Sequence, residues 1–268
     1  MSVYADVYRY RELFGSLFRR DLRAKYRGSF LGLGWSLLHP LVLMLVYLVV
    51  FSVLWRVSKV GSSDDYWLFL MCGLPAWVFF ATASQAASRS LLENANLIRK
   101  VRFPRQLVPL SVVATQLVTF AAMLVVLMVV NAIVIPETRD TFLLAVPVSA
   151  GIVCFVAGVA LLVSCANVVF RDVEHLVQAV LLPWFFLTPI LYRLEDLPGG
   201  VQRYDWVVTI LRWCNPLTPP LYALRDPLFY GTVPDVWDVV YLVVEAVIAL
   251  ALGAWVFRRV DDRIAVEL

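Results

Sequence analysis

Side chains that could carry out chemistry are few in this sequence, and they are widely spaced. Glu245 is the one carboxylate near the middle of a long apolar run, where a charge costs about 3 kcal/mol on membrane-insertion scales. It marks either a functional site, such as a proton relay, or a structural carboxyl held inside a helix bundle. His39 and His175 have no carboxylate or cysteine at ligand spacing, so no metal site is expected. No serine lies in a nucleophile elbow, and enzymatic chemistry is not predicted.

The three lysines argue against ATP hydrolysis by this chain. A phosphate-binding P-loop needs a lysine after the pattern GxxxxG. Lys25, Lys59 and Lys100 do not follow such a pattern. We therefore expect no cofactor in this chain, and any energy from ATP must arrive through another subunit.

Aromatic residues are the second group with a chemical role to consider. Tyr47 and Phe51 lie four residues apart within one apolar run, and Trp184 and Phe185 are adjacent in another, away from its ends. Aromatic faces can stack on sugar rings, so these four side chains are candidates for lining a conduit for a glycan. The alternative is that they pack one helix against another.

These residues must be positioned by membrane-spanning helices. Hydrophobic residues make up 61% of the 268 residues and charged residues only 16%, whereas a soluble domain is about 45–50% apolar. Apolar runs of membrane-spanning length predict six transmembrane helices in an all-α, single-domain membrane protein covering residues 1–268. The runs are residues 35–55, 66–88, 106–136, 141–170, 176–192 and, interrupted only by Glu245, 239–257.

Residues 9–27 predict an amphipathic helix before the first span. Tyr10, Phe14, Phe18 and Leu22 recur every four residues, and the same segment contains seven arginines and lysines. An apolar face opposite a basic face is typical of a helix lying in the membrane interface. With the N-terminus inside, the inner segments contain 16 of the 23 basic residues, so the positive-inside rule predicts that both termini are cytoplasmic. The basic residues thus indicate membrane orientation and no nucleic-acid partner.

The outer connection, residues 193–235, is too apolar for an ordinary loop. Its apolar runs at 206–214 and 217–230 are each too short to cross a bilayer and are separated by Asn215 and Pro216. Runs of this length predict two short re-entrant helices, or alternatively helices lying flat on the outer surface. On the inner side, Leu91, Leu92, Ala95 and Ile98 predict a short amphipathic helix within residues 88–106. It rests on lipid headgroups or docks on a cytoplasmic partner.

Several segments, taken together, resemble the permease subunits of ABC-type polysaccharide and polyol-phosphate exporters. These subunits move lipid-linked O-antigen, capsule, galactan or teichoic acid chains in bacteria. Each segment alone is weakly diagnostic, but their order and spacing relative to the six predicted spans is specific. The matching residues are the basic helix leading into Tyr26-Arg27-Gly28, Leu31-Gly32 and Trp35; Asn96-Leu97-Ile98-Arg99-Lys100 with Phe103-Pro104-Arg105; Asn167-Val168-Val169-Phe170-Arg171-Asp172; Trp184-Phe185-Phe186-Leu187-Thr188-Pro189-Ile190 with Tyr192; and Asn215-Pro216.

The resemblance implies an ATP-driven transporter in the bacterial cytoplasmic (inner) membrane. Two copies of this chain would associate with two copies of a P-loop ATPase, which binds ATP and Mg, and would move a glycan attached to polyprenyl pyrophosphate. It implies ATPase contacts for Asn96, Leu97, Ile98, Arg99, Lys100, Phe170, Arg171 and Asp172, and a substrate channel lined by Tyr47, Phe51, Trp184 and Phe185. The rival predictions are a proton-coupled transporter using Glu245 and a membrane transferase acting on lipid-linked sugars.

Overall fold

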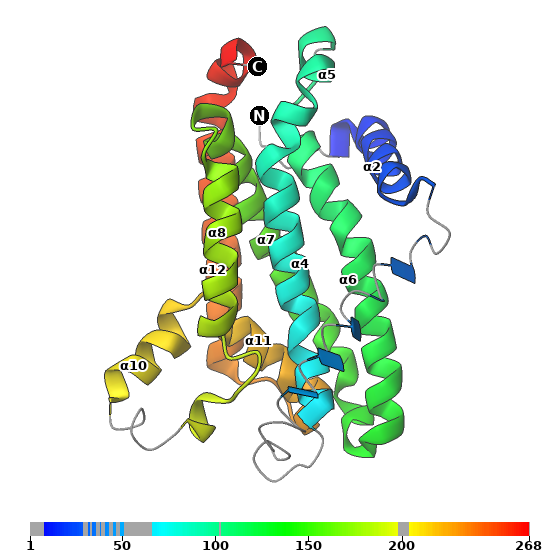
Figure 1. Cartoon of the computed structure of the whole chain (residues 1–268), viewed down its shortest axis with the longest axis vertical. Helices are drawn as coiled ribbons and strands as arrows, with labels where there is room; N and C mark the ends of the chain where they lie inside the picture. The colour runs from blue at the N-terminus through cyan, green and yellow to red at the C-terminus, as the bar shows by residue number, and fades with distance from the viewer. Residues whose placement is uncertain are drawn as a thin grey trace.

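The computed structural model describes residues 8–28, scattered positions between 32 and 50, and residues 66–101, 103–197 and 204–267. The described elements are helices joined by turns and short connections, as the all-α prediction requires (Figure 1). The first predicted span, with Tyr47 and Phe51, falls largely outside the described residues, and both of these side chains are outside them.

Four described helical segments are long and apolar enough to cross a membrane. A fifth apolar helix has only 15 residues, or about 22 Å at ~1.5 Å per residue, which is shorter than a ~30 Å hydrocarbon core. The count of six spans therefore stays a prediction. The four long helices are α4 (Tyr66–Glu93), α6 (Leu107–Val134), α7 (Ala145–Val169, preceded by the 3₁₀ turn η3, Phe142–Leu144) and α12 (Val236–Glu267), and the fifth is α8 (Val173–Leu187).

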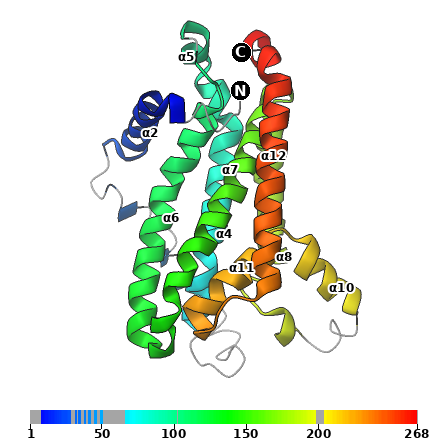
Figure 2. The ribbon, with the colours of Figure 1, turned by 180° about the vertical axis from the view of Figure 1, so that it is seen from behind.

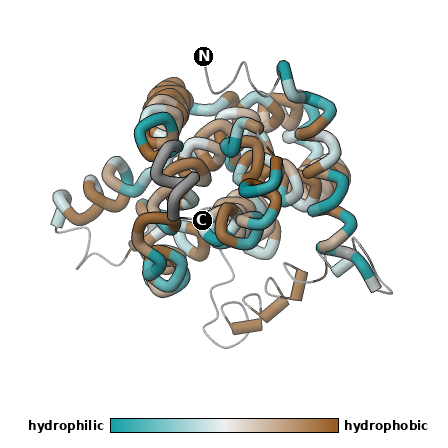
Figure 3. Tube along the Cα trace, turned by 90° about the horizontal axis from the view of Figure 1, so that it is seen from above, coloured by the Kyte–Doolittle hydropathy of each residue, from teal (hydrophilic) through white to brown (hydrophobic). Residues whose placement is uncertain are grey.

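The long helices are apolar on their outer as well as their inner faces. Figure 3 shows hydrophobic residues on outward turns of the bundle, and exposed side chains include Val125, Ile133, Val243 and Val247. Soluble monomers rarely expose contiguous apolar patches of this kind. The surface therefore supports the prediction of a multi-pass membrane protein.

Helix α4 is the centre of the bundle and packs on α6, α7 and α8. Its aromatic side chains supply much of the core. Phe79 stacks on Phe120 of α6 with ring centroids 4.8 Å apart, and Phe80 stacks on Phe155 of α7 at 6.0 Å. Because aromatic pairs contribute beyond their buried area, these contacts fix α4 against two neighbours.

One end of the bundle gathers elements that are far apart in sequence. It carries α2 (Arg11–Tyr26), α5 (Ala95–Lys100), the turn at residues 170–172 and the C-terminal end of α12 (Figures 1 and 2). The opposite end carries the connection between α6 and α7, which contains the 3₁₀ turn η2 (Pro136–Asp140), and residues 188–197 and 204–235. This distribution agrees with the alternation of inner and outer connections expected from the sequence.

The predicted inner-loop helix is divided into two parts. Helix α4 continues to Glu93, and α5 begins only at Ala95, after a bend at Asn94. The carbonyl of Asn94 accepts hydrogen bonds from the backbone N–H groups of Leu97 and Ile98. A short helix is thus present within residues 88–106, as α5, but Leu91 and Leu92 belong to the end of α4 instead, because a helix need not end where its apolar run ends.

Two short helical segments lie on either side of Asn215 and Pro216, as the sequence predicts, whereas their depth in the membrane stays a prediction. A partly buried ion pair holds the first segment to α12, since Arg212 donates to both carboxylate oxygens of Asp238 at 2.7 Å. The elements of this outer region are η4 (Leu194–Asp196), α10 (Asp205–Thr209) with the π-helical turn η5 (Ile210–Cys214), and α11 (Thr218–Arg225) with the π-helical turn η6 (Asp226–Tyr230).

Candidate functional site

The residues proposed from the sequence to contact an ATPase lie at the end of the bundle that carries α2. Helix α5 and the turn at residues 170–172 both reach this end (Figure 1). Together they present polar, charged and aromatic side chains that a partner could reach. Asn96, Arg99, Lys100, Phe170, Arg171 and Asp172 are exposed, Leu97 is half-buried and Ile98 is buried.

Ile98 positions α5 rather than facing outward. It belongs to a hydrophobic cluster that also includes Leu17 of α2, Leu91 of α4, Leu107 of α6 and Phe257 of α12. We call this the inner-end cluster, after the cytoplasmic side on which the sequence predicts this end of the bundle to lie. Because this cluster joins side chains from six helices, including α7 and α12, a displacement of α5 would disturb the packing at this end of the bundle.

The turn at residues 170–172 is held by Asn167, a buried side chain on the last turn of α7. Its Oδ1 accepts a hydrogen bond of 2.9 Å from the backbone N–H of Glu174, in the first turn of α8. Helix starts leave N–H groups without helical partners, and here a residue seven positions upstream satisfies one. The sequence pointed to Asn167 only through the family resemblance, since no local capping pattern places it there.

An ion pair holds the connection between α5 and α6 in place. Arg105 forms an ion pair with Asp261 near the C-terminal end of α12, with 2.9 Å between Nη1 and Oδ1, and it also donates to the backbone carbonyl of Asp261. Both partners are partly exposed, so the pair adds little stability. Its effect is to fix the position of this connection beside α12.

The two described aromatic candidates, Trp184 and Phe185, pack against α4 in this single copy. Phe185 is only 5% exposed and lies 5.5 Å from Trp77 between ring centroids. Trp184 packs edge-to-face on Phe80 at 5.2 Å, and its Nε1 donates to Oδ1 of Asn215 at 3.0 Å. Helix packing is therefore part of what both rings do.

Trp184 also lines an apolar groove of about 410 Å³ between α8 and η5 with the adjoining Asn215 and Pro216. The next aromatic residue along α8, Phe186, is 55% exposed. Phe186 belongs to the segment that resembles the permease family, but the sequence did not single it out, because adjacency alone cannot say which ring faces outward. The groove is lined by Val180, Pro183, Trp184, Leu187, Ile210, Leu211, Cys214, Asn215 and Pro216.

Glu245 lies in α12, where its two carboxyl oxygens are buried. Neither oxygen has a hydrogen-bond partner in the part of the chain that the structure describes. Among the same residues, no group of three His, Cys, Asp or Glu side chains could hold a metal ion.

Comparison with known proteins decides the family. A family model described as "ABC-2 type transporter" matches residues 12–229, which is most of the chain. The chain belongs to the ABC-2 type transporter family. Membership confirms the resemblance to ABC transporter permeases that the sequence motifs indicated, and with it the prediction of a transporter rather than an enzyme.

Relatives of this ABC-2 family chain match it over nearly its whole length. The O-antigen export system permease protein RfbA of Myxococcus xanthus is 31% identical over 261 residues, covering 97% of this chain and 96% of the relative. RfbA of Klebsiella pneumoniae is 29% identical over 248 residues, covering 92% and 91%. The polysialic acid transport protein KpsM of Escherichia coli is 22% identical over 249 residues, covering 92% and 93%.

Proposed function

We propose that this chain is the membrane-spanning subunit of an ATP-driven exporter for a lipid-linked polysaccharide, such as an O-antigen, a teichoic acid or a similar cell-surface glycan. The observation that carries the proposal is the nearly full-length similarity to permeases named for O-antigen export. The membrane would be the bacterial cytoplasmic (inner) membrane, with both termini on the cytoplasmic side. Proton-coupled transport through Glu245 is not proposed, because the chain belongs to an ABC transporter family.

The working assembly would contain two copies of this chain and two copies of a P-loop ATPase that binds ATP and Mg. The exposed surface of α5 and of residues 170–172 supports this assembly, because both lie at one end of the bundle. Closure of the ATPase pair would push these two elements. A route for the glycan and its polyprenyl pyrophosphate carrier would then open between the first and fifth spans of the two copies, past Tyr47, Phe51, Trp184 and Phe185.

Charge reversal at the proposed ATPase surface should weaken the assembly. We expect the double variant Arg99→Glu, Arg171→Glu to recover at most about a tenth of the ATPase that co-purifies with the unaltered chain, because like charges across an interface cost several kcal/mol. The measurement is the ratio of ATPase to permease after affinity purification. Arg139→Glu is the matched control, since Arg139 is exposed and belongs to η2, in the connection between α6 and α7 at the opposite end of the bundle. The proposed function would be refuted if no P-loop ATPase co-purified with the unaltered chain and if deletion of this chain removed no surface glycan.

An aromatic contact with sugar predicts a specific effect at Phe186. We expect Phe186→Ala to lower glycan export roughly twofold to tenfold, since aromatic contacts contribute about 0.5–1.5 kcal/mol. The yield of folded protein should not change, because the ring is largely exposed in one copy. Export is measured as the surface polysaccharide restored to a deletion strain. Leu182→Ala, on the same face of α8 and also exposed, should export normally, and equal losses in both variants would assign this face to apolar packing.

A further inference from the structure

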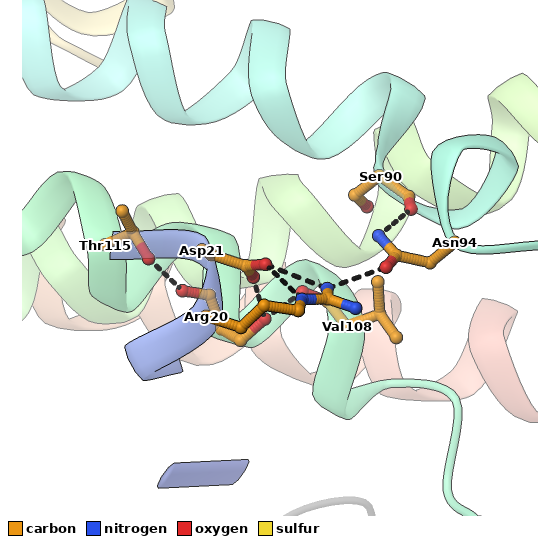
Figure 4. Close-up of polar contacts among 7 residues, drawn as sticks. Arg20, Asp21, Ser90, Asn94, Val108 and Thr115 are labelled. Carbon is orange, nitrogen blue, oxygen red and sulfur yellow. Dashed lines mark hydrogen bonds and ion pairs between the residues drawn. The ribbon is translucent and has the colours of Figure 1, made fainter. Parts of the chain in front are cut away.

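Arg20 on α2 reaches the bend between α4 and α5. Its Nη2 donates to Oδ1 of Asn94 at 2.7 Å, and its Nε and Nη2 donate to Oδ1 of Asp21 at 3.0 and 2.8 Å (Figure 4). Asn94 is the residue at the bend, and its own amide donates to the carbonyl of Ser90 at 2.8 Å. The guanidinium of Arg20 therefore joins α2 to the point where α5 leaves the axis of α4.

The same helix is fixed to α6 by separate contacts. The second carboxylate oxygen of Asp21 lies 2.9 Å from the hydroxyl of Ser111, whose single hydrogen is also within reach of the Val108 carbonyl. Farther along α2, Nζ of Lys25 donates to Oε1 of Gln116 at 2.7 Å. Helix α2 is thus also held along α6 by contacts that do not involve Asn94.

The apolar side of α2 packs in the same cluster as residues of α4 and α5. Leu17 is buried in the inner-end cluster, which also contains Leu91 at the end of α4 and Ile98 of α5. The cluster keeps α2 close to α5, but apolar contacts are non-directional. The hydrogen bonds of Arg20 have defined directions, and charge-assisted bonds are about twice as strong as neutral ones.

We propose that Arg20 is a positioning residue that makes α2 follow the movement of α5. This inference rests on the proposed function, in which an ATPase pushes α5. A displacement of α5 moves Asn94. The hydrogen bond that Arg20 donates to Asn94 then passes this displacement to α2 at the membrane surface. The side chain of Arg20 is 46% exposed, so its bonds contribute little to stability and its replacement should leave the fold intact.

The test uses the whole permease–ATPase complex, produced in cells that lack the chromosomal copy of this chain. In Arg20→Met, the ATPase that co-purifies and the rate of phosphate release should stay within about twofold of the unaltered complex. Export per ATP hydrolysed should fall at least about fivefold, the lower end of typical coupling between sites. The deletion strain lacks a surface polysaccharide, and export is measured as the amount of this polysaccharide that each variant restores. Arg23→Met, an exposed arginine one turn farther along α2, should export normally.

Variants of Asn94 distinguish coupling from anchoring. Asn94→Ala should reproduce the loss, and the double variant with Arg20→Met should be no worse than the more affected single variant, because both remove the same bond. Asn94→Asp should restore export, since its carboxylate still accepts from Arg20.

Three results would overturn the coupling role: normal export in Arg20→Met, additive losses in the double variant, or a loss of export that only follows a loss of co-purified ATPase. The last result would show a static anchor. If the proposed function itself were wrong, the unaltered chain would show it. No ATPase would co-purify with that chain, and deletion of its chromosomal copy would remove no surface glycan.

Discussion

Replacing Gly158 by alanine is expected to prevent most of this protein from reaching its folded state. A Cβ added at Gly158 of α7 would lie 2.3 Å from the carbonyl carbon of Ala249 and 2.5 Å from the backbone nitrogen of Leu250 in α12. Both atoms are backbone, so no change of side-chain rotamer relieves the overlap, and the two helices must separate. Overpacking typically costs 1–3 kcal/mol, and we expect about 3 kcal/mol or more here. The measurement is the yield of monodisperse protein in detergent and its thermal midpoint.

Two other glycines provide matched controls for this expectation. A Cβ at Gly15 in α2 meets no atom within 4 Å, so Gly15→Ala should be neutral or stabilising by up to about 1 kcal/mol through helix propensity. The three atoms nearest to a Cβ at Gly151 in α7 all belong to the side chain of Leu242, which can shift more easily than backbone, so Gly151→Ala should have an intermediate effect. A Gly158→Ala variant as stable as the unaltered protein would contradict the close approach of α7 and α12.

The positions of the long helices could be predicted from the sequence because a bilayer demands continuous apolar runs. The run at residues 106–136 became α6, Leu107–Val134. Helix ends were less predictable, since a helix can continue into water once it has left the membrane. The last apolar run ends at Phe257, yet α12 continues to Glu267, and its extension brings Asp261 to Arg105.

The partners of individual site residues could not be predicted in this way. Arg20 and Asn94 are 74 positions apart, and a hydrogen bond between distant segments leaves no periodic signal in either one. The family resemblance did place α5 and residues 170–172 in one functional group. It could not show that Ile98 points into the inner-end cluster while its neighbours Arg99 and Lys100 are exposed.

Arg225 is the clearest case of a residue whose importance only the fold reveals. In the sequence it is one of the basic residues of the outer connection, yet its side chain is 2% exposed. Its Nη1 and Nη2 donate to the carbonyls of Pro189 and Ile190, both at 2.6 Å. The guanidinium also lies 3.7 Å from the ring centroid of Phe69 in α4. Arg225 therefore joins α11, the turn after α8 and the central helix.

This turn needs such a donor because its backbone departs from the helix. Thr188 precedes Pro189 and is extended, as residues before proline usually are, so the carbonyls that follow lack helical partners. The hydroxyl of Tyr66 donates to the next carbonyl, that of Leu191, at 2.7 Å. Buried backbone carbonyls need hydrogen-bond partners, and here two side chains satisfy three consecutive carbonyls.

We expect Arg225→Met to destabilise the protein by about 2–4 kcal/mol. Methionine keeps an apolar stem but leaves two buried carbonyls unpaired, at about 1–3 kcal/mol each, and removing a buried cation offsets part of that cost. Unfolding in mixed micelles measures the change. Arg139→Met is the control, because Arg139 also donates to one backbone carbonyl, that of Ala132, but is exposed, so its loss should cost about 1 kcal/mol or less. Equal effects of the two substitutions would mean that burial does not set the contribution of Arg225, and that the turn after α8 is held by other contacts.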